Sequence, residues 1–107
     1  MNDFDLAETG HDGEAGVRHL AARGELDVDS SPRFTERLDQ VIEDGSTLVV
    51  IDCSDIGFID CCGLRAVLLA TDELEAHGGR LVLDQPSPVL SRVIELAGLS
   101  ERFATRD

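Results

Sequence analysis

Positive charge is scarce in this sequence. The chain holds nine lysine and arginine residues, all of them arginine, against 22 aspartate and glutamate residues, so its formal net charge is −13. A surface this acidic repels nucleic acid and anionic lipid, and we therefore expect neither to be a primary partner. The same charge favours encounter with a basic protein surface.

Signals for export and for membrane insertion are also missing. No basic N-terminal region is followed by an apolar stretch, so we expect no signal peptide. The aliphatic runs LVVI and AVLLA are too short to cross a bilayer. The cysteines, Cys53, Cys61 and Cys62, are odd in number and lack the spacing of a secreted disulfide scaffold. These absences predict a cytoplasmic protein with reduced thiols and no membrane partner.

The apolar residues suffice for one modest core. A length of 107 residues and a hydrophobic content of 42% predict one folded domain over residues 1–107. No repeat, low-complexity tract or linker divides the chain. Residues 1–16 are polar and contain glycine, which predicts a partly flexible segment or an edge strand that begins in FDLAE and turns at residues 11–13.

The first of three amphipathic helical patterns follows the GELD segment. Ser31 is expected to be its N-cap, with Pro32 at the first helical position. Gly45 is expected to end it. The buried face is predicted to comprise Phe34, Leu38, Val41 and Ile42.

The other elements continue an alternation of strands and helices. Helices are predicted at about residues 62–77 and from Ser87 to Gly98, and strands at residues 17–23, 47–52 and 80–84 and near Phe103. The strand at 47–52 shows no polar alternation, which is typical of a parallel strand covered on both faces. The order of elements predicts an α/β fold whose central mixed sheet has parallel core strands and three to four packed helices.

The segment FIDCCG, residues 58–63, is the first candidate for a functional site. It follows the strand predicted to end at Asp52 and leads into the second helix, with Asp60 as the expected N-cap. Functional sites of parallel sheets gather outside the carboxyl ends of the strands. The position of this segment therefore indicates a site before its chemistry is considered.

The adjacent cysteines of this segment suggest three chemistries, and their surroundings suit none of them well. Structural zinc needs four Cys or His ligands, and no histidine is near in sequence. A cysteine phosphatase loop needs a wider spacing than that from Cys61 or Cys62 to Arg65. A helix N-terminus favours a redox-active thiolate, but Asp60 opposes it. A redox switch stays open; otherwise we expect Cys53 to be buried, Cys62 to pack in the first helical turn and Cys61 to be exposed.

We find a family resemblance over residues 24–70, GELDVDSSPRFTERLDQVIEDGSTLVVIDCSDIGFIDCCGLRAVLLA. This stretch resembles the STAS domain of anti-sigma-factor antagonists. The resemblance rests on the GELD turn, the apolar strand ending in Asp52, the lead Phe58-Ile59-Asp60, and Gly63-Leu64 at the start of the next helix. Residues 80–99, RLVLDQPSPVLSRVIELAGL, are similar to the following strand and helix of that family.

The resemblance implies a protein-interaction domain rather than an enzyme. In that family the domain binds an anti-sigma factor that is also a serine kinase, which releases a sigma factor and so regulates transcription. The kinase then phosphorylates a serine or threonine just after the Asp that precedes the helix, adding a charge of about −1.5 to −2, and binding is lost. The resemblance places Cys61 at this phosphoacceptor position, so we expect no serine phosphorylation of the loop.

The resemblance also implies a partner-binding surface. Its residues are Asp27, Asp60, Cys61, Cys62, Gly63 and Arg65. Taken alone, Asp27 could simply end its turn, and Arg65 could be a solvated or ion-paired arginine. No catalytic residue, cofactor or metal is expected. Two alternatives stay open, a STAS scaffold or subunit of a signalling or transport complex, and an antagonist that responds to thiol oxidation.

Overall fold

The protein is built on a sheet of five strands joined largely by helices. The computed structural model describes residues 4–12 and 16–107. Its elements, in chain order, are β1 (Phe4–Asp12), β2 (Val17–Leu26), α1 (Ser31–Glu43), β3 (Leu48–Ile59), α2 (Cys61–Ala76), β4 (Arg80–Asp84), α3 (Pro88–Leu96) and β5 (Ala104–Arg106). The strands lie in the order β1-β2-β3-β4-β5, with β1 antiparallel to β2 and the other pairs parallel. The predicted mixed sheet with a parallel core and packed helices is confirmed.

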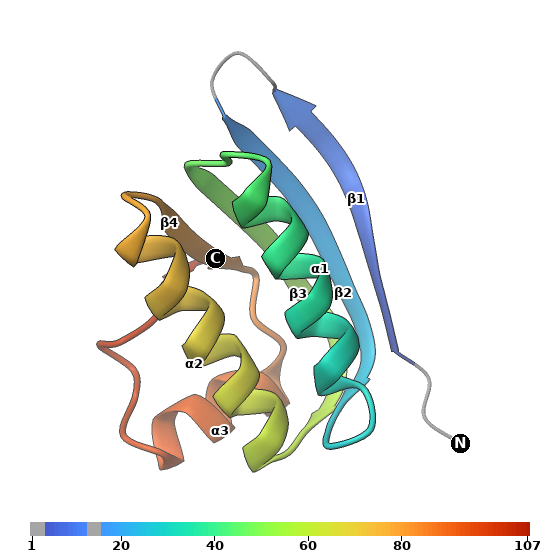
Figure 1. Ribbon diagram of the computed structural model, residues 1–107. Coiled ribbons are helices and arrows are strands. Elements are labelled where there is room, and N and C mark those ends of the chain that lie inside the picture. Colours follow the sequence, from blue (N-terminus) through green and yellow to red (C-terminus); the bar gives the residue numbers. More distant parts are fainter. Residues whose placement is uncertain (1–3, 13–15) are drawn as a thin grey trace.

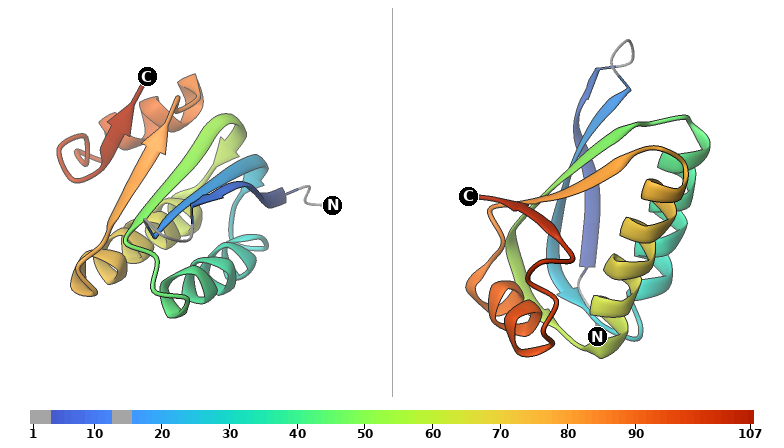
Figure 2. Two further views of the ribbon diagram at one scale, coloured as in Figure 1. Left: turned by 90° about the horizontal axis from the view of Figure 1, so that it is seen from above. Right: turned by 90° about the vertical axis from the view of Figure 1, so that its left-hand side faces the viewer.

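The helices lie on both faces of the sheet. α1 and α2 lie side by side on one face, and α3 lies on the opposite face beside β3 (Figures 1 and 2). Three consecutive residues of β3, Val49, Val50 and Ile51, are buried. Both faces of this central strand are therefore covered, as its apolar run without alternation predicted.

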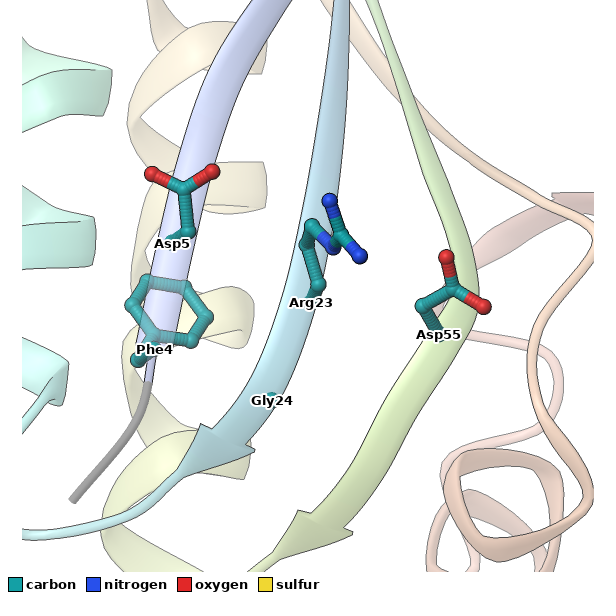
Figure 3. Close-up of a pocket in the computed structure, with 5 residues that line it drawn as sticks. All are labelled: Phe4, Asp5, Arg23, Gly24 and Asp55. Carbon is teal, nitrogen blue, oxygen red and sulfur yellow. The ribbon is translucent and has the colours of Figure 1, made fainter.

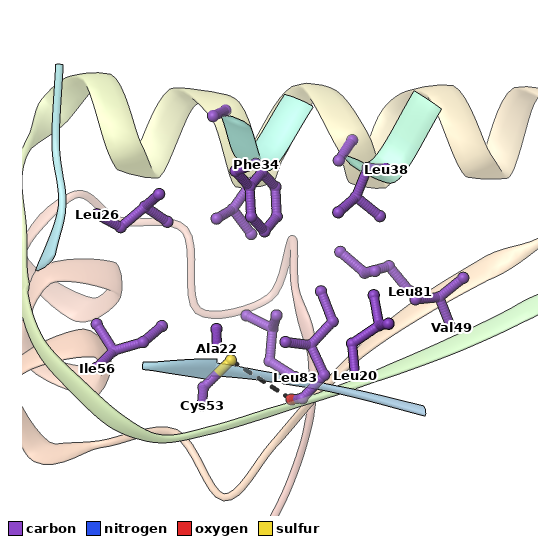
Figure 4. Close-up of a cluster of buried hydrophobic side chains, with 14 of the residues drawn as sticks. Leu20, Ala22, Leu26, Phe34, Leu38, Val49, Cys53, Ile56, Leu81 and Leu83 are labelled. Atoms are coloured by element: carbon purple, nitrogen blue, oxygen red, sulfur yellow. Dashed lines mark hydrogen bonds between the residues drawn. The ribbon is translucent and has the colours of Figure 1, made fainter. Parts of the chain in front are cut away.

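The main core fills the space between the sheet and the pair α1 and α2. Phe34 and Leu38 of α1 lie above side chains of β2 and β4, including Leu20 and Leu81 (Figure 4). The predicted buried face of the first helix is confirmed, because all four of its residues are buried: Phe34, Leu38, Val41 and Ile42.

Cys53 belongs to this core. Its side chain is 2% exposed, and its Sγ donates to the Ile51 carbonyl oxygen at 3.4 Å (Figure 4). Desolvation by burial, with a smaller effect of the nearby carboxylates of Asp52 and Asp84, raises the pKa of the Cys53 thiol to about 12. Cys53 is therefore a buried, unreactive thiol, and the predicted burial is confirmed.

Two strands extend further than their local sequence predicted. β2 continues to Leu26 instead of ending near residue 23, and β3 continues to Ile59 instead of ending at Asp52. The two extensions pair with each other through Leu26 and Ile59, after register shifts that interrupt the simple alternation. Pairing between strands distant in sequence therefore overrides the polar residues that indicated a loop.

Both α1 and α2 begin one residue earlier than predicted. Ser30 rather than Ser31 is the N-cap of α1, and Ser30 makes no side-chain capping bond. Its hydroxyl donates instead to the Glu25 carbonyl oxygen at 2.7 Å, which ties the turn before α1 back to β2. α2 begins at Cys61 rather than Cys62.

β1 bears out the edge-strand alternative for the start of the chain. It covers Phe4–Asp12 at one end of the strand order. The turn predicted at residues 11–13 lies partly outside the described residues, and β1 runs through Asp12.

Candidate functional site

The candidate site lies where β2 and β3 end together. Leu26 and Ile59, the last residues of these parallel strands, are paired in the sheet. Residues 27–30 follow β2 and lead into α1, whereas Asp60 follows β3 and leads into α2. The sheet therefore brings two segments that are distant in sequence to one end of the molecule, as parallel topology predicts.

Asp60 joins these two segments through its carboxylate. One oxygen, Oδ1, accepts a hydrogen bond from the Gly63 N–H at 2.9 Å, which caps α2. The other, Oδ2, accepts from the Val28 N–H at 3.2 Å. The Asp60 backbone N–H also donates to the Leu26 carbonyl oxygen at 3.2 Å. The predicted N-cap is confirmed, and it proves to hold the turn after β2 as well.

Asp27 organises that turn from within. Its Oδ1 accepts from the Asp29 N–H at 2.9 Å and from the Ser30 N–H at 3.2 Å, the pattern of an Asx turn. The Ser30 hydroxyl oxygen accepts from the Asp27 N–H at 2.9 Å, and Ser30 is fully buried. Asp27 therefore shapes the turn. The next residue, Val28, is the one whose N–H donates to Asp60.

Gly63 allows the start of α2 to approach the end of β2. A Cβ atom built on Gly63 would lie 2.2 Å from the Leu26 carbonyl oxygen and 2.8 Å from its carbon. These separations are far below van der Waals contact, so no other residue fits without moving the backbone. Gly63 therefore acts through close packing rather than by offering a functional group.

The two thiols of α2 are both open to solvent. Cys61 and Cys62 are exposed free cysteines. The predicted exposure of Cys61 is confirmed, but the predicted packing of Cys62 is wrong. The first turn of α2 buries Gly63 and Leu64, whereas Cys62 lies on the solvent face of the helix. Arg65 is also exposed on this helix.

Sequence reasoning missed two exposed apolar side chains beside the site. Val28 is 60% exposed and Phe58 is 44% exposed, although both are large hydrophobic residues. Val28 stands alone among polar residues of a turn, which is the signal that could have identified it. Phe58 sits two residues before Asp60 in β3, and its exposure depends on the register of that strand extension. Exposed apolar residues beside a polar rim are typical of protein contact surfaces.

Two substitutions of Asp60 should distinguish how much its bonds to Gly63 and to Val28 contribute to stability. We expect Asp60→Ala to lower the free energy of unfolding by about 2 kcal/mol, because it removes an N-cap and the tie to Val28. Asp60→Asn keeps one carbonyl oxygen that can accept from Gly63, so its loss should be about half as large. Urea denaturation of both variants measures the difference, and equal losses would contradict a capping role for Asp60.

Two further observations concern metal binding and membrane-spanning helices. Over residues 4–12 and 16–107, no group of three or more His, Cys, Asp or Glu side chains is placed to hold a metal ion. Among the helices in the same residues, none has the length and apolar character needed to span a membrane.

Known proteins share this fold and part of this sequence. The STAS domain family matches residues 11–107. RsfB of Mycobacterium tuberculosis, an anti-sigma-F factor antagonist, is 32% identical over 88 residues, which make up 82% of this chain and 71% of RsfB. The chain belongs to the STAS domain family.

Solved structures agree with this assignment. A crystal structure of an anti-sigma factor antagonist from Mycobacterium paratuberculosis has a TM-score of 0.82 and 25% identity, covering 97% of this chain and 86% of that one. SpoIIAA, an anti-sigma factor antagonist, has a TM-score of 0.75 in its unphosphorylated form, with 26% identity and coverage of 96% and 87%. A structure of SpoIIAA from Bacillus in the phosphorylated form has a TM-score of 0.70, 26% identity and coverage of 96% and 90%.

Proposed function

We propose that this protein is an anti-sigma-factor antagonist. In this role it binds an anti-sigma factor of the serine-kinase type, releases a sigma factor and so regulates transcription in the cytoplasm. Its domain, residues 1–107, acts by binding and catalyses no reaction. Membership of the STAS family and the names of RsfB and SpoIIAA support this function.

The proposed contact surface is the end of the sheet where β2 and β3 stop. The predicted partner-binding residues come from the turn and from the start of α2, namely Asp27, Asp60, Cys61, Cys62, Gly63 and Arg65. The Asp60 carboxylate fixes the two segments relative to each other, so a partner meets a preformed surface. Val28 and Phe58 add exposed apolar area beside these polar groups.

A second part of the proposal, that serine phosphorylation does not switch this surface, rests on a pair of exposed thiols at the start of α2. SpoIIAA has been solved in both unphosphorylated and phosphorylated forms. In this chain no serine or threonine occurs between Asp55 and Ala70, and Cys61 stands where the resemblance places the acceptor. A protonated thiol is close to a serine hydroxyl in shape and is uncharged. The surface therefore stays in the state that corresponds to the unphosphorylated form.

Hydroxyl groups near the site do not replace the missing acceptor. Ser30 is fully buried in the turn before α1. Ser54 lies within β3, and its hydroxyl donates to the Asp52 carboxylate at 2.7 Å. A kinase that acts on the exposed start of α2 would therefore find only thiols there.

The test combines binding and phosphorylation with the cognate anti-sigma factor. We expect the wild-type protein to bind the anti-sigma factor, to displace the sigma factor and to stay unphosphorylated with ATP and Mg²⁺, as measured by mass spectrometry. Cys61→Ser should bind equally well and become phosphorylated at residue 61. Cys62→Ser is the matched control and should stay unphosphorylated. Failure of the wild type to bind the cognate factor would refute the proposal that an anti-sigma factor is the partner. Phosphorylation of the wild type at the start of α2 would refute the proposal that the surface stays unphosphorylated.

A further inference from the structure

The edge strand β1 lies outside the helical layer. β1 occupies one end of the strand order, so among the described strands it has a neighbour only on its β2 side. α1 lies over the sheet inward of β1, and α2 lies beyond α1 (Figure 1). A nine-residue edge strand offers a row of backbone N–H and C=O groups to another chain.

A groove runs between β1 and α1. A hollow of about 180 Å³ is lined by Phe4, Asp5, Leu6, Arg33 and Arg37. A neighbouring hollow of about 240 Å³ on α1 is lined by the same two arginines together with Glu36 and Gln40. Because residues 33 and 37 are four positions apart on a helix, their side chains lie on one face. We call these hollows together the β1 groove.

The two arginines of the β1 groove are weakly engaged. The Arg33 guanidinium lies 5.9 Å from the centre of the Phe4 ring, a cation–π contact. Arg37 Nη2 is 3.7 Å from Glu8 Oε1, but both oxygens of Glu8 are bound by Arg18 at 2.7 Å. The Nε of Arg37 is buried and has no hydrogen-bond partner among the described residues. Neither guanidinium therefore has a strong salt bridge of its own among the described residues, although the carboxylates of Asp5 and Glu36 also line the groove.

Arg23 of β2 differs from Arg33 and Arg37 because it has a carboxylate neighbour on each adjacent strand. It lines another hollow, of about 420 Å³, with Phe4, Asp5, Gly24 and Asp55. The side chain of Arg23 lies between Asp5 of β1 and Asp55 of β3, which are its cross-strand neighbours (Figure 3). Arg23 is thus balanced by carboxylates on both sides, so this hollow is a weaker candidate for an anionic ligand than the β1 groove.

We propose that the β1 groove binds an extended acidic segment of a partner protein, which adds a strand to β1. Backbone hydrogen bonds to the open edge hold the segment, and its alternate side chains provide specificity. Carboxylates on the side facing α1 pair with Arg33 and Arg37, since guanidinium groups bind carboxylates with two parallel hydrogen bonds. A second copy of this chain would bring a net charge of −13, whereas a short acidic segment brings only a few charges, placed at the two arginines, so the occupant is a segment of a different protein.

The probe is a peptide with blocked termini in which glutamate and valine alternate. Its length of about eight residues is normal for a β-strand. Its binding is followed by amide chemical shifts of the ¹⁵N-labelled full chain. We expect shifts at residues 4–8 and around Arg33 and Arg37. The peptide with lysine in place of glutamate should bind about tenfold more weakly or worse. The same glutamate peptide with N-methylated backbone amides should lose binding, because it cannot donate to the edge of β1.

Variants of the protein test the two arginines directly. Arg33→Gln combined with Arg37→Gln should lower the affinity for the glutamate peptide by about tenfold or more. Arg33→Lys combined with Arg37→Lys keeps the charge and should retain part of the affinity. Arg92→Gln, which changes an exposed arginine of α3, is the matched control and should bind like the wild type. Thermal unfolding of each variant shows that the fold is kept.

Several results would overturn the proposal. Equal affinity for the glutamate and lysine peptides would show that charge does not determine binding. Unchanged binding of the N-methylated peptide would show that the peptide does not add a strand to β1. Absence of shifts in β1 at millimolar peptide would show that the groove takes no such segment. A dimer that forms without peptide and is lost in the arginine double variant would assign the edge to a second copy instead. None of these results depends on whether the start of α2 binds an anti-sigma factor.

Discussion

Gly63→Ala is expected to lower the free energy of unfolding by about 3 kcal/mol, the upper part of the range for overpacking a close contact. The added methyl group would lie 2.2 Å from the Leu26 carbonyl oxygen and 3.0 Å from Ile59 Cγ1. That carbonyl oxygen also accepts the Asp60 N–H, so moving it away weakens the bond that joins the two segments of the site. We therefore expect the variant to lose both stability and binding to the anti-sigma factor.

Gly57→Ala is the matched control for this substitution. Gly57 lies in β3, and a Cβ atom there has nothing within 4 Å. Alanine at this position should change the free energy of unfolding by less than about 1 kcal/mol, with stabilisation favoured because glycine loses more backbone entropy on folding. Urea denaturation at constant pH compares the two variants. A Gly63→Ala protein as stable as the Gly57→Ala protein would contradict the close approach of α2 to β2.

Cys61→Glu is expected to weaken binding to the anti-sigma factor by about tenfold or more, which corresponds to about 1.4 kcal/mol. The proposed interface buries an uncharged thiol at this position, and a carboxylate placed there loses hydration without gaining a cation. The carboxylate of Asp60, the preceding residue, adds repulsion. The substitution imitates the charge of a phosphate that the wild-type residue cannot receive from a serine kinase.

Folding should not account for that loss of binding. An acidic side chain in the first turn of a helix is favourable by about 0.3–1 kcal/mol, so Cys61→Glu should be at least as stable as the wild type. Cys61→Gln supplies the same bulk without charge and should bind within about threefold of the wild type. Calorimetric titration of the three proteins with the anti-sigma factor measures the difference. If the glutamine and glutamate variants bind equally well, charge at residue 61 is not what controls the contact.

The architecture could be predicted from the sequence because its signals are local and repeated. The buried face of α1 follows from residues spaced at helical intervals, and the central position of β3 follows from an apolar run without alternation. The cap at Asp60 was also predictable, since an aspartate ahead of an apolar helical pattern satisfies a free backbone N–H. These features depend on the few residues around each position.

The errors concern features that depend on distant partners. β2 and β3 continue past their apolar runs because Leu26 and Ile59 pair with each other, and neither local pattern shows this. The packing predicted for Cys62 failed because Cys62 lies on the solvent face of α2 with Arg65 and Leu69, and the face that is buried is set by how the helix packs on the sheet. The second bond of Asp60, to Val28, links residues 32 positions apart and could not be inferred from either segment alone.

The shared carboxylate of Asp60 has a consequence for the motions of the site. The amides of Val28 and Gly63 bind the two oxygens of one side chain, so rotation of that side chain exposes both amides to solvent together. Release of the Val28 amide in the turn before α1 and fraying of the first turn of α2 are then coupled rather than independent fluctuations. A partner that closes over either segment slows the opening of both, so the entropic cost of ordering the surface is incurred once.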